Sequence, residues 1–208
     1  MKRRLILLAG LIALSVSSIA DPASTAIAAE AKRFEPVVTD DGLLAQPWFL
    51  TSFLDLKEDH AEAMANDKRF AVIWELRGCP YCKVLHTTNL ARPNIQKLAH
   101  SNFEILQLNI IGSRKVVDFD GEELTEKQLA RKHGVRFTPS MQFFGKTVSE
   151  ETGAKNEVAR MAGYYKPFHF YTLLEFVSSG AYERTKFRQY LKRKYRTLVA
   201  KGVDVEKW

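Results

Sequence analysis

The chain of 208 residues contains two cysteines, Cys79 and Cys82, which stand two residues apart. An apolar, strand-like run (70–76) precedes them and a helix-compatible segment follows, so Cys79 is expected at the first turn of a helix. There, free N–H groups and the helix dipole stabilise a thiolate, which is the nucleophile in thiol chemistry. Pro80 fits this placement, because proline is well tolerated at the first helical position. The spacing therefore predicts a redox-active pair.

Other uses of the pair are less consistent with the sequence. A structural zinc site needs four ligands, and there is no second cysteine pair to complete it. Covalent haem attachment needs a histidine directly after Cys82, where Lys83 stands. A structural disulfide closing so short a loop removes little unfolded-state entropy. The alternative that stays open is a metal-binding (copper) chaperone using Cys79, Cys82 and His86; the redox interpretation needs no metal or organic cofactor.

The N-terminus has the pattern of a secretory signal peptide. A basic start, Lys2-Arg3-Arg4, precedes an apolar stretch over 5–16 that is too short to span a bilayer. We expect a signal peptide over 1–28 and a mature tail over 29–46, and an uncleaved anchor is the alternative. The expected location is the bacterial periplasm, where a dithiol needs an electron donor to stay reduced.

Much of the net charge of +7 lies from Arg184 onward. Basic residues alternate there with apolar residues at helical spacing, which predicts a basic amphipathic helix within 181–208. We expect this helix to pack on the domain with a solvated cationic face. Peripheral contact with an anionic membrane or an acidic partner is the alternative. A nucleic-acid partner is not expected, and neither is an oligomer.

Between the two ends, apolar periodicity and turn residues predict alternating helices and strands. Helices alternating with strands indicate parallel pairing, and two adjacent strands near the end indicate a hairpin. We expect an α/β fold with a mixed sheet of about four strands flanked by helices. The expected helices are 48–66, a segment from Pro80 that is broken near Pro93, 95–100 capped by Asn94, 126–133 capped by Thr125, and one that begins at Pro167. The expected strands are 70–76, 103–110, 137–144 and 158–162. Residues 118–122 are expected to form an acidic turn.

Two separated motifs carry a resemblance to the thioredoxin superfamily. One is Gly78-Cys79-Pro80-Tyr81-Cys82 after a strand, and the other is Val135-Arg136-Phe137-Thr138-Pro139 about sixty residues later. The sequence resembles, in particular, exported bacterial thioredoxin-like proteins of the sulfur-oxidation and cytochrome-maturation kind. The resemblance implies a thioredoxin-like domain over 47–180.

The resemblance also implies roles for individual residues. Cys79 corresponds to the attacking thiolate and Cys82 to the resolving thiol. Pro139 corresponds to the cis-proline beside the pair, and Thr138 and Tyr81 are expected to contact substrate. Pro80 and Glu75 are candidates for tuning the pair. The positive charge of Arg77 is expected to lower the pKa of Cys79, and a solvated surface charge is the alternative for Arg77.

The sequence departs from the family pattern at two points. Ile73 stands where thioredoxins place a buried aspartate. The proton-accepting role of that aspartate is therefore absent here or has moved to Glu75, which lies on the same strand face as Ile73. The alternative for Glu75 is a solvated carboxylate at the strand end. The Pro80-Tyr81 dipeptide is typical of glutaredoxins, but glutathione is not carried over as a substrate, because an exported bacterial protein meets little of it.

The resemblance implies thiol–disulfide exchange outside the cytoplasm. We expect a reductase of exported disulfide proteins that takes electrons from a membrane thiol transporter, because no oxidase-type helical insertion fits between Ile111 and Pro139. A dithiol oxidase or isomerase is the alternative.

Overall fold

The computed structural model describes residues 36–207. The predicted signal peptide and the first part of the predicted tail (29–35) lie outside the described residues. Within 36–207, no helix has the length and apolar character needed to cross a membrane.

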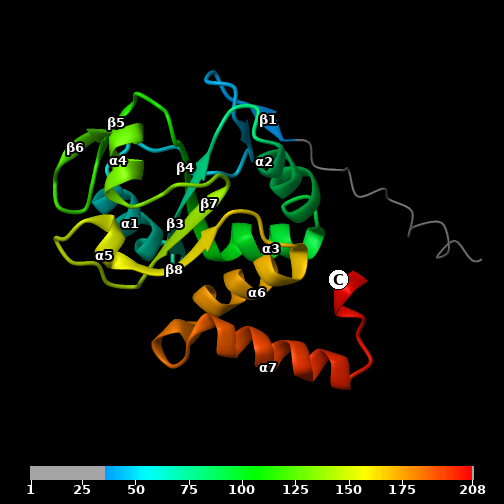
Figure 1. Cartoon of the computed structure of the whole chain (residues 1–208). Helices are drawn as coiled ribbons and strands as arrows, with labels where there is room; N and C mark the ends of the chain where they lie inside the picture. The colour runs from blue at the N-terminus through cyan, green and yellow to red at the C-terminus, as the bar shows by residue number, and fades with distance from the viewer. Residues whose placement is uncertain (1–35, 208) are drawn as a thin grey trace, which may run out of the picture. The chain divides into compact units, whose positions relative to one another are not determined.

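A four-stranded sheet in the order β4-β3-β7-β8 forms the centre of the domain (Figure 1). β3 pairs with β4 in parallel and with β7 antiparallel, and β8 is antiparallel to β7. The mixed sheet predicted from the sequence is therefore confirmed. Its strands are β3 (Arg69–Glu75), β4 (Phe103–Asn109), β7 (Ser140–Phe144) and β8 (Glu157–Ala162).

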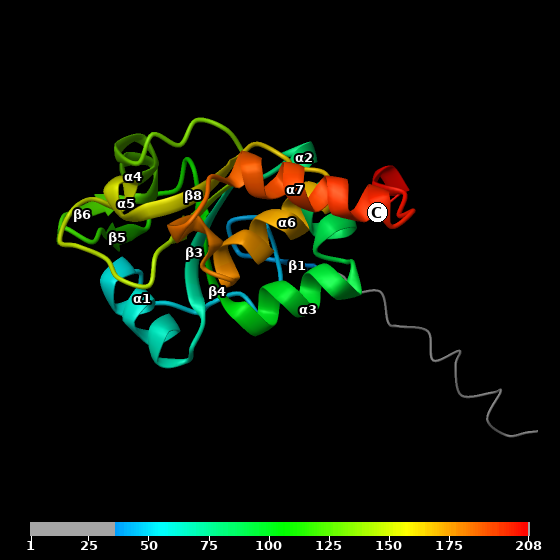
Figure 2. The same cartoon turned by 90° about the horizontal axis from the view of Figure 1, so that it is seen from below.

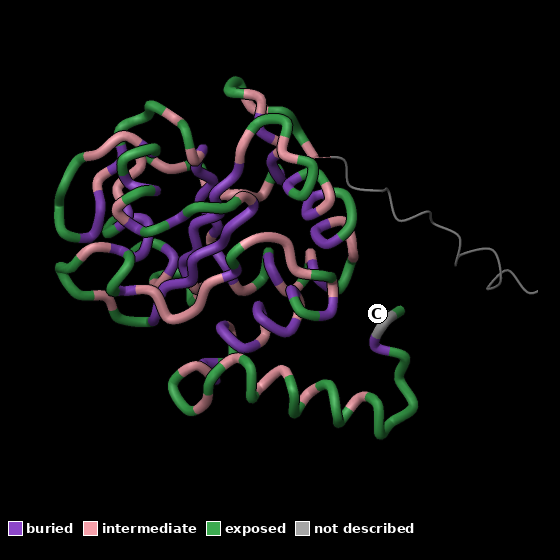
Figure 3. Tube along the Cα trace, viewed as in Figure 1, coloured by how far each residue is buried: buried purple, intermediate pink, exposed green. Residues whose placement is uncertain are grey.

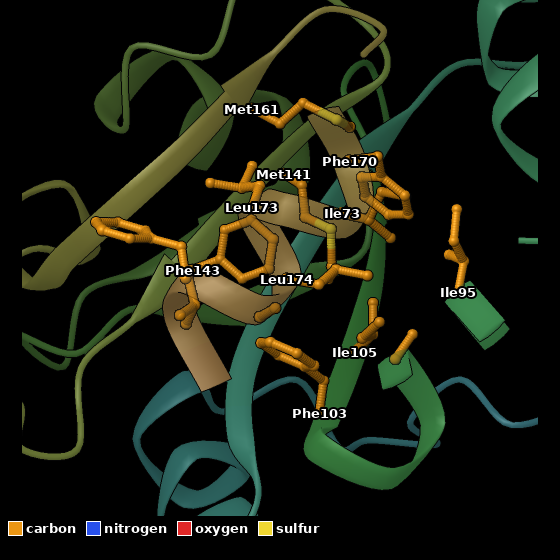
Figure 4. Packing of buried hydrophobic residues seen from close by; sticks show 14 of the residues in the cluster. Ile73, Ile95, Phe103, Ile105, Met141, Phe143, Met161, Phe170, Leu173 and Leu174 are labelled. Carbon is orange, nitrogen blue, oxygen red and sulfur yellow. The ribbon is translucent and has the colours of Figure 1, made fainter. Parts of the chain in front are cut away.

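Helices cover both faces of this sheet (Figures 1 and 2). Because strand side chains alternate between faces, Ile73 lies in one apolar core with α3 and α6, and Trp74 lies in the other with α1 and α4. Figure 4 shows the first of these cores. The helices are α1 (Leu56–Ala65), α2 (Pro80–Val84), the π-helical turn η2 (Leu85–Asn89), α3 (Pro93–Asn102), α4 (Glu126–Lys132), α5 (Gly153–Asn156), α6 (Pro167–Ser178), α7 (Phe187–Ala200) and the short turns η3 (Ala181–Glu183) and η4 (Val205–Lys207).

The prediction of a helix over 48–66 is wrong for its first part, because α1 begins only at Leu56. Asp55 caps it, and its carboxylate accepts the backbone N–H groups of Lys57 and Glu58 at 2.9 and 3.0 Å. Leu54 has a positive φ of 68° and cannot continue a helix toward the N-terminus. Capping and backbone conformation therefore outweigh the apolar pattern of the preceding segment.

Proline sets two further boundaries that differ from the expectation. β7 begins at Ser140 rather than 137, directly after Pro139, which has no N–H to donate to a neighbouring strand. α3 begins at Pro93 with Arg92 at the cap position, so Asn94 lies inside the helix instead of capping it. The predicted Thr125 cap of α4 is confirmed, as a capping box with Gln128.

Two small hairpins were not expected. β5 (Lys115–Val117) and β6 (Glu123–Thr125) flank the predicted acidic turn. β1 (Val37–Val38) and β2 (Leu44–Ala45) form a hairpin inside the segment expected to be a tail. The strands in both hairpins are short, so their sequence periodicity carries little signal.

The predicted basic C-terminal helix is present as α7, and it packs against α6. Phe187 and Tyr190 contact the core, while Tyr190 and Lys194 bind Glu175 of α6. The remaining surface of α7 is largely exposed (Figure 3). The expectation of a terminal helix packed on the domain is therefore confirmed.

Candidate functional site

The loop between β3 and α2 places Cys79 at the start of a helix. Gly78 has a φ of 76°, a left-handed conformation that favours glycine, and it turns the chain out of β3. Cys79 is the N-cap residue of α2, and Pro80 occupies the first turn. The strand, turn and helix expected around the pair are all observed.

The sulfur of Cys79 lies within a shell of polar groups. The backbone N–H of Cys82 donates to Cys79 Sγ at 3.2 Å. Thr138 contributes its hydroxyl, which donates to Sγ at 3.4 Å, and its carbonyl oxygen lies 3.5 Å from Sγ. Both cysteines are free thiols in this structure, and Cys79 is partly exposed. Cys79 is therefore the sulfur that an external disulfide can reach.

Cys82 lies deeper, with 4% of its surface exposed. Burial raises the pKa of the Cys82 thiol, and hydrogen bonding to Cys79 and the negative charge of Glu75 raise it further. A thiol in this environment reacts slowly with external reagents but is placed to attack a disulfide formed on Cys79. This asymmetry matches the roles implied for the two cysteines.

The Thr138–Pro139 peptide bond is cis. The contacts of Thr138 with Cys79 place the loop that precedes β7 directly beside the pair, as the resemblance implied. The tertiary fold thus joins two motifs that are about sixty residues apart in the sequence.

Exposed aromatic side chains adjoin the pair. Tyr81, inside the motif, is 60% exposed and stacks on Tyr164 with ring centroids 6.0 Å apart. Phe137, directly before Thr138, is 62% exposed. Tyr164 in turn donates its hydroxyl to Asn89 Oδ1 at 2.9 Å. These rings offer apolar surface near the reactive sulfur, and the sequence reasoning included only Tyr81 among them.

Arg77, which was expected to tune the pair, faces a different neighbourhood. Its side chain lies against Gly42, where an added Cβ would collide with it. It lines a pocket of about 290 Å³ together with Asp41, Arg114 and Glu126. Among the hydrogen bonds and ion pairs of the described residues, none joins Arg77 to Cys79. The structure therefore gives Arg77 no direct contact through which to tune the pair.

Glu75 is buried, with 1% of its surface exposed, so the solvated alternative is wrong. Its carboxylate accepts a hydrogen bond from the ring of His86, whose Nε2 lies 3.0 Å from Oε2 and 3.1 Å from Oε1. The Nε2 of Gln107 on β4 donates to Oε2 as well. Ile73, two residues earlier, is buried on the same face of β3, as the strand register predicts.

Both ring nitrogens of His86 are occupied, which argues against the metal-chaperone alternative. Its Nε2 contacts Glu75, and its Nδ1 lies 2.9 Å from the Nε2 of Gln46. Within residues 36–207, no group of three or more histidine, cysteine, aspartate or glutamate side chains is arranged to hold a metal ion. The proposed ligands Cys79, Cys82 and His86 are therefore not assembled as a metal site.

Gln46 and Gln107 are two further residues near the pair that the sequence analysis missed. Gln46 belongs to the segment interpreted as a tail, and Gln107 is a buried polar residue of β4. No sequence motif identifies an amide that meets a partner from another element. The available signal was the spacing of His86, four residues after Cys82 and on the same helical face.

Comparison with known proteins gives one family match. Residues 56–178, more than half of the chain, match the model of the thioredoxin-like domain. A search of curated proteins finds no match.

Solved structures with a similar fold include three bacterial proteins. A thioredoxin-fold protein from Helicobacter pylori is 21% identical and covers 68% of this chain and 99% of its own, with a TM-score of 0.49. A thioredoxin from Thermus thermophilus is 24% identical and covers 58% and 82%, with a TM-score of 0.45. A disulphide isomerase from Xylella fastidiosa Temecula1 is 14% identical and covers 64% and 86%, with a TM-score of 0.35.

Proposed function

Since the chain belongs to the thioredoxin-like domain family, we propose that it is a thiol–disulfide oxidoreductase acting through Cys79 and Cys82. The observation that carries this proposal is the asymmetry of the pair. Cys79 is partly exposed at a helix N-terminus and beside the cis-proline loop, whereas Cys82 is buried behind it.

The reaction transfers two electrons from the dithiol to a substrate disulfide. The Cys79 thiolate attacks one substrate sulfur, which forms a mixed disulfide and releases the other sulfur as a thiolate. Cys82, as a thiolate, then attacks Cys79 Sγ, and the second substrate sulfur leaves with its bonding electrons. The products are a Cys79–Cys82 disulfide and a reduced substrate, and reduction by an external dithiol restores the pair.

The surroundings of Cys79 favour an extended polypeptide as substrate. Thr138 precedes the cis-proline and is expected to offer backbone groups to such a chain, while Tyr81 and Phe137 expose apolar rings. A disulfide within an extended segment that has apolar neighbours fits this surface better than the disulfide of a small, highly charged thiol does.

For the biological setting, we propose a periplasmic reductase of exported proteins that receives electrons from a membrane thiol transporter and works as a monomer. The signal-peptide pattern over 1–28 supports export. The described chain has no large helical insertion between Ile111 and Pro139, where β5, β6 and the seven-residue α4 lie. The exposed basic side chains of α7 would support peripheral contact with an anionic membrane.

Disulfide reduction and trapping test the function. The wild type should accelerate reduction of insulin by dithiothreitol, and both Cys79→Ser and Cys82→Ser should abolish the acceleration. Cys82→Ser should also accumulate mixed disulfides with periplasmic proteins, because attack occurs without resolution, whereas Cys79→Ser should accumulate none. Equal trapping by the two variants would contradict the assigned roles.

The reduction potential of the pair tests the direction of electron flow. A reductase should have a potential nearer about −270 mV than about −120 mV, and each 30 mV corresponds to about 1.4 kcal/mol. A value near −120 mV would identify an oxidase.

A further inference from the structure

Arg77 and the pocket that it lines have no role in the reaction described above. The pocket, of about 290 Å³, is also lined by Asp41, Arg114, Glu126 and residues at the end of β4 and after it. Asp41 belongs to the turn of the β1–β2 hairpin, whereas the family match begins at residue 56. The hairpin therefore supplies a wall of the pocket that the matched domain alone would lack.

The pocket lies at the same edge of the sheet as the cysteine pair. Arg77 follows β3, two residues before Cys79, so the Cα atoms of these two residues are at most about 7 Å apart. β4 runs parallel to β3, and the backbone N–H of Ile110 donates to the Glu75 carbonyl at 3.0 Å. The segment after β4 therefore leaves the sheet beside the loop that carries Cys79, at the carboxyl ends where ligands of α/β sheets commonly bind.

Gly42 holds the side chain of Arg77 against the hairpin. Gly42 has a φ of 79°, and a Cβ added to it would lie 2.5 Å from Cδ of Arg77, so the aliphatic part of Arg77 packs directly on the turn. The turn itself is fixed through Asp41, whose carboxylate accepts the Thr39 hydroxyl at 2.6 Å and Nδ2 of Asn109 at 3.0 Å. These contacts restrain Arg77 at the wall of the pocket.

The other arginine and the buried acid of the pocket already have partners. Arg114 Nη2 donates to Glu126 Oε1 at 2.6 Å and to the Gln107 carbonyl at 3.1 Å. Glu126 is buried, and its Oε1 also accepts the backbone N–H of Asn109 at 2.8 Å. Within residues 36–207, by contrast, the exposed guanidinium of Arg77 takes part in no hydrogen bond or ion pair. Its N–H donors are therefore available to a ligand.

The free guanidinium and the acids around it define the chemistry of this ligand. A guanidinium binds a carboxylate through two parallel N–H···O hydrogen bonds. The charged side chains of the lining are Arg77, Arg114, Asp41 and Glu126, so the pocket has no net charge. A ligand with a single negative charge is therefore favoured over a phosphate-type dianion, on which the two acids would act twice as strongly.

We propose that Arg77 binds the carboxylate of an aspartate or glutamate side chain close to the disulfide cysteine of a polypeptide substrate. This role of Arg77 rests on the proposed function and names a feature of its substrates. Ile111, which is 61% exposed and lines the same pocket, offers apolar surface to the methylene groups of such a side chain. Arg77 thus selects substrates by binding and takes no part in the transfer of electrons.

Single-cysteine peptides with a neutral 2-thiopyridyl group on the sulfur test this role with the reduced, full-length protein. The Cys79 thiolate attacks the peptide sulfur, and the thiopyridine leaves as a thiolate that takes a proton from solvent. Cys82 loses its proton to solvent and attacks Cys79 Sγ, which releases the peptide thiolate and leaves the pair oxidised. Stopped-flow absorbance of the released thiopyridone measures the second-order rate constant of the first attack.

The peptides have blocked ends, so that the side chain under test is their only carboxylate. Glutamate is placed in turn at each of the three residues before and after the cysteine, and each peptide is compared with its glutamine counterpart. At one or more of these positions the glutamate peptide should react at least about threefold faster, the size expected for a well-oriented exposed ion pair.

Variants of the protein assign this rate ratio to Arg77. Arg77→Gln should bring the ratio close to one, and Arg77→Glu should make a lysine peptide the fastest at the same position. The control is Arg131→Gln, which removes an exposed arginine from the last turn of α4, outside the pocket lining, and should keep the wild-type ratio. A merely structural role of Arg77 would change the rates of both peptides alike and leave their ratio in place.

Equal rates for the glutamate and glutamine peptides at every position would overturn the proposal. So would a ratio that Arg77→Gln leaves unchanged, or one that Arg131→Gln lowers as much as Arg77→Gln does. Arg77 is exposed, so its substitution is not expected to prevent folding. If the wild type released no thiopyridone from any peptide, the proposed function itself would be contradicted.

Discussion

Replacing Asp59 with asparagine should stabilise the protein at neutral and alkaline pH but not in acid. Asp59 lies in α1 and is 6% exposed, and its carboxylate accepts a hydrogen bond from the Ser52 hydroxyl at 2.6 Å. Burial raises the pKa of Asp59 from 3.8 to about 6, and the charges of Asp55, Glu62 and Glu58 add to the increase, against the lowering effect of Ser52. The ionised carboxylate of Asp59 therefore destabilises the folded state.

The sign and size of this stability change follow from the linkage between proton binding and folding. Because the folded pKa is the higher one, the contribution of Asp59 to stability is fully present below about pH 3.8 and is lost as pH rises through about 6. The difference between these values corresponds to about 3 kcal/mol at about 1.36 kcal/mol per pKa unit, and solvent screening reduces it to about 1–2 kcal/mol. The amide oxygen of the substituted asparagine would still accept the hydrogen bond from Ser52, without the charge.

Urea unfolding followed by circular dichroism at pH 4, 6 and 8 measures the effect. The gain in unfolding free energy for Asp59→Asn should be about 1–2 kcal/mol at pH 8 and close to zero at pH 4. The control is Glu62→Gln, which removes an exposed carboxylate from the same helix and should change stability little at either pH. A gain of the same size at pH 4 and pH 8 would refute the argument, because it would not arise from ionisation.

Three other predictions concern the pair and the leader. In the reduced protein near neutral pH, iodoacetamide should modify Cys79 at least about tenfold faster than Cys82. Burial raises the pKa of Cys82, and each pKa unit removes about nine-tenths of the thiolate. Peptide mass spectrometry measures both rates, and faster modification of Cys82 would reverse the assigned roles. Replacing Pro80-Tyr81 with Gly-Pro should lower the reduction potential in a glutathione titration, and an unchanged value would show the dipeptide to be incidental. Intact-mass measurement on periplasmic protein should place the mature N-terminus within 21–30, whereas full-length chain in the membrane fraction would indicate an anchor.

The sequence predicted the local parts of the site well, because local interactions determine them. The positions of Cys79, Pro80 and Gly78 around a helix start follow from capping and backbone preferences within a few residues. The capping box of α4 is equally local. The alternation of side chains along β3 was enough to place Glu75 on the face of Ile73.

Boundaries set by competing local signals were predicted less well. Asp55 starts α1 eight residues later than the apolar pattern suggested, since a satisfied cap and a residue with positive φ override periodicity. The β1–β2 hairpin, in the segment taken for a tail, is too short to produce a pattern, yet it leads directly into Gln46.

Only the tertiary structure shows the surroundings of Glu75. Its carboxylate meets His86 from the active-site helix and Gln107 from a parallel strand, and Gln46 closes the chain from the N-terminal segment. The sequence alone allowed Glu75 to be either a proton-accepting carboxylate near the pair or a solvated carboxylate at the strand end. Burial excludes the solvated acid, because a carboxylate removed from water must find donors, and those donors come from segments that only the folded sheet brings together.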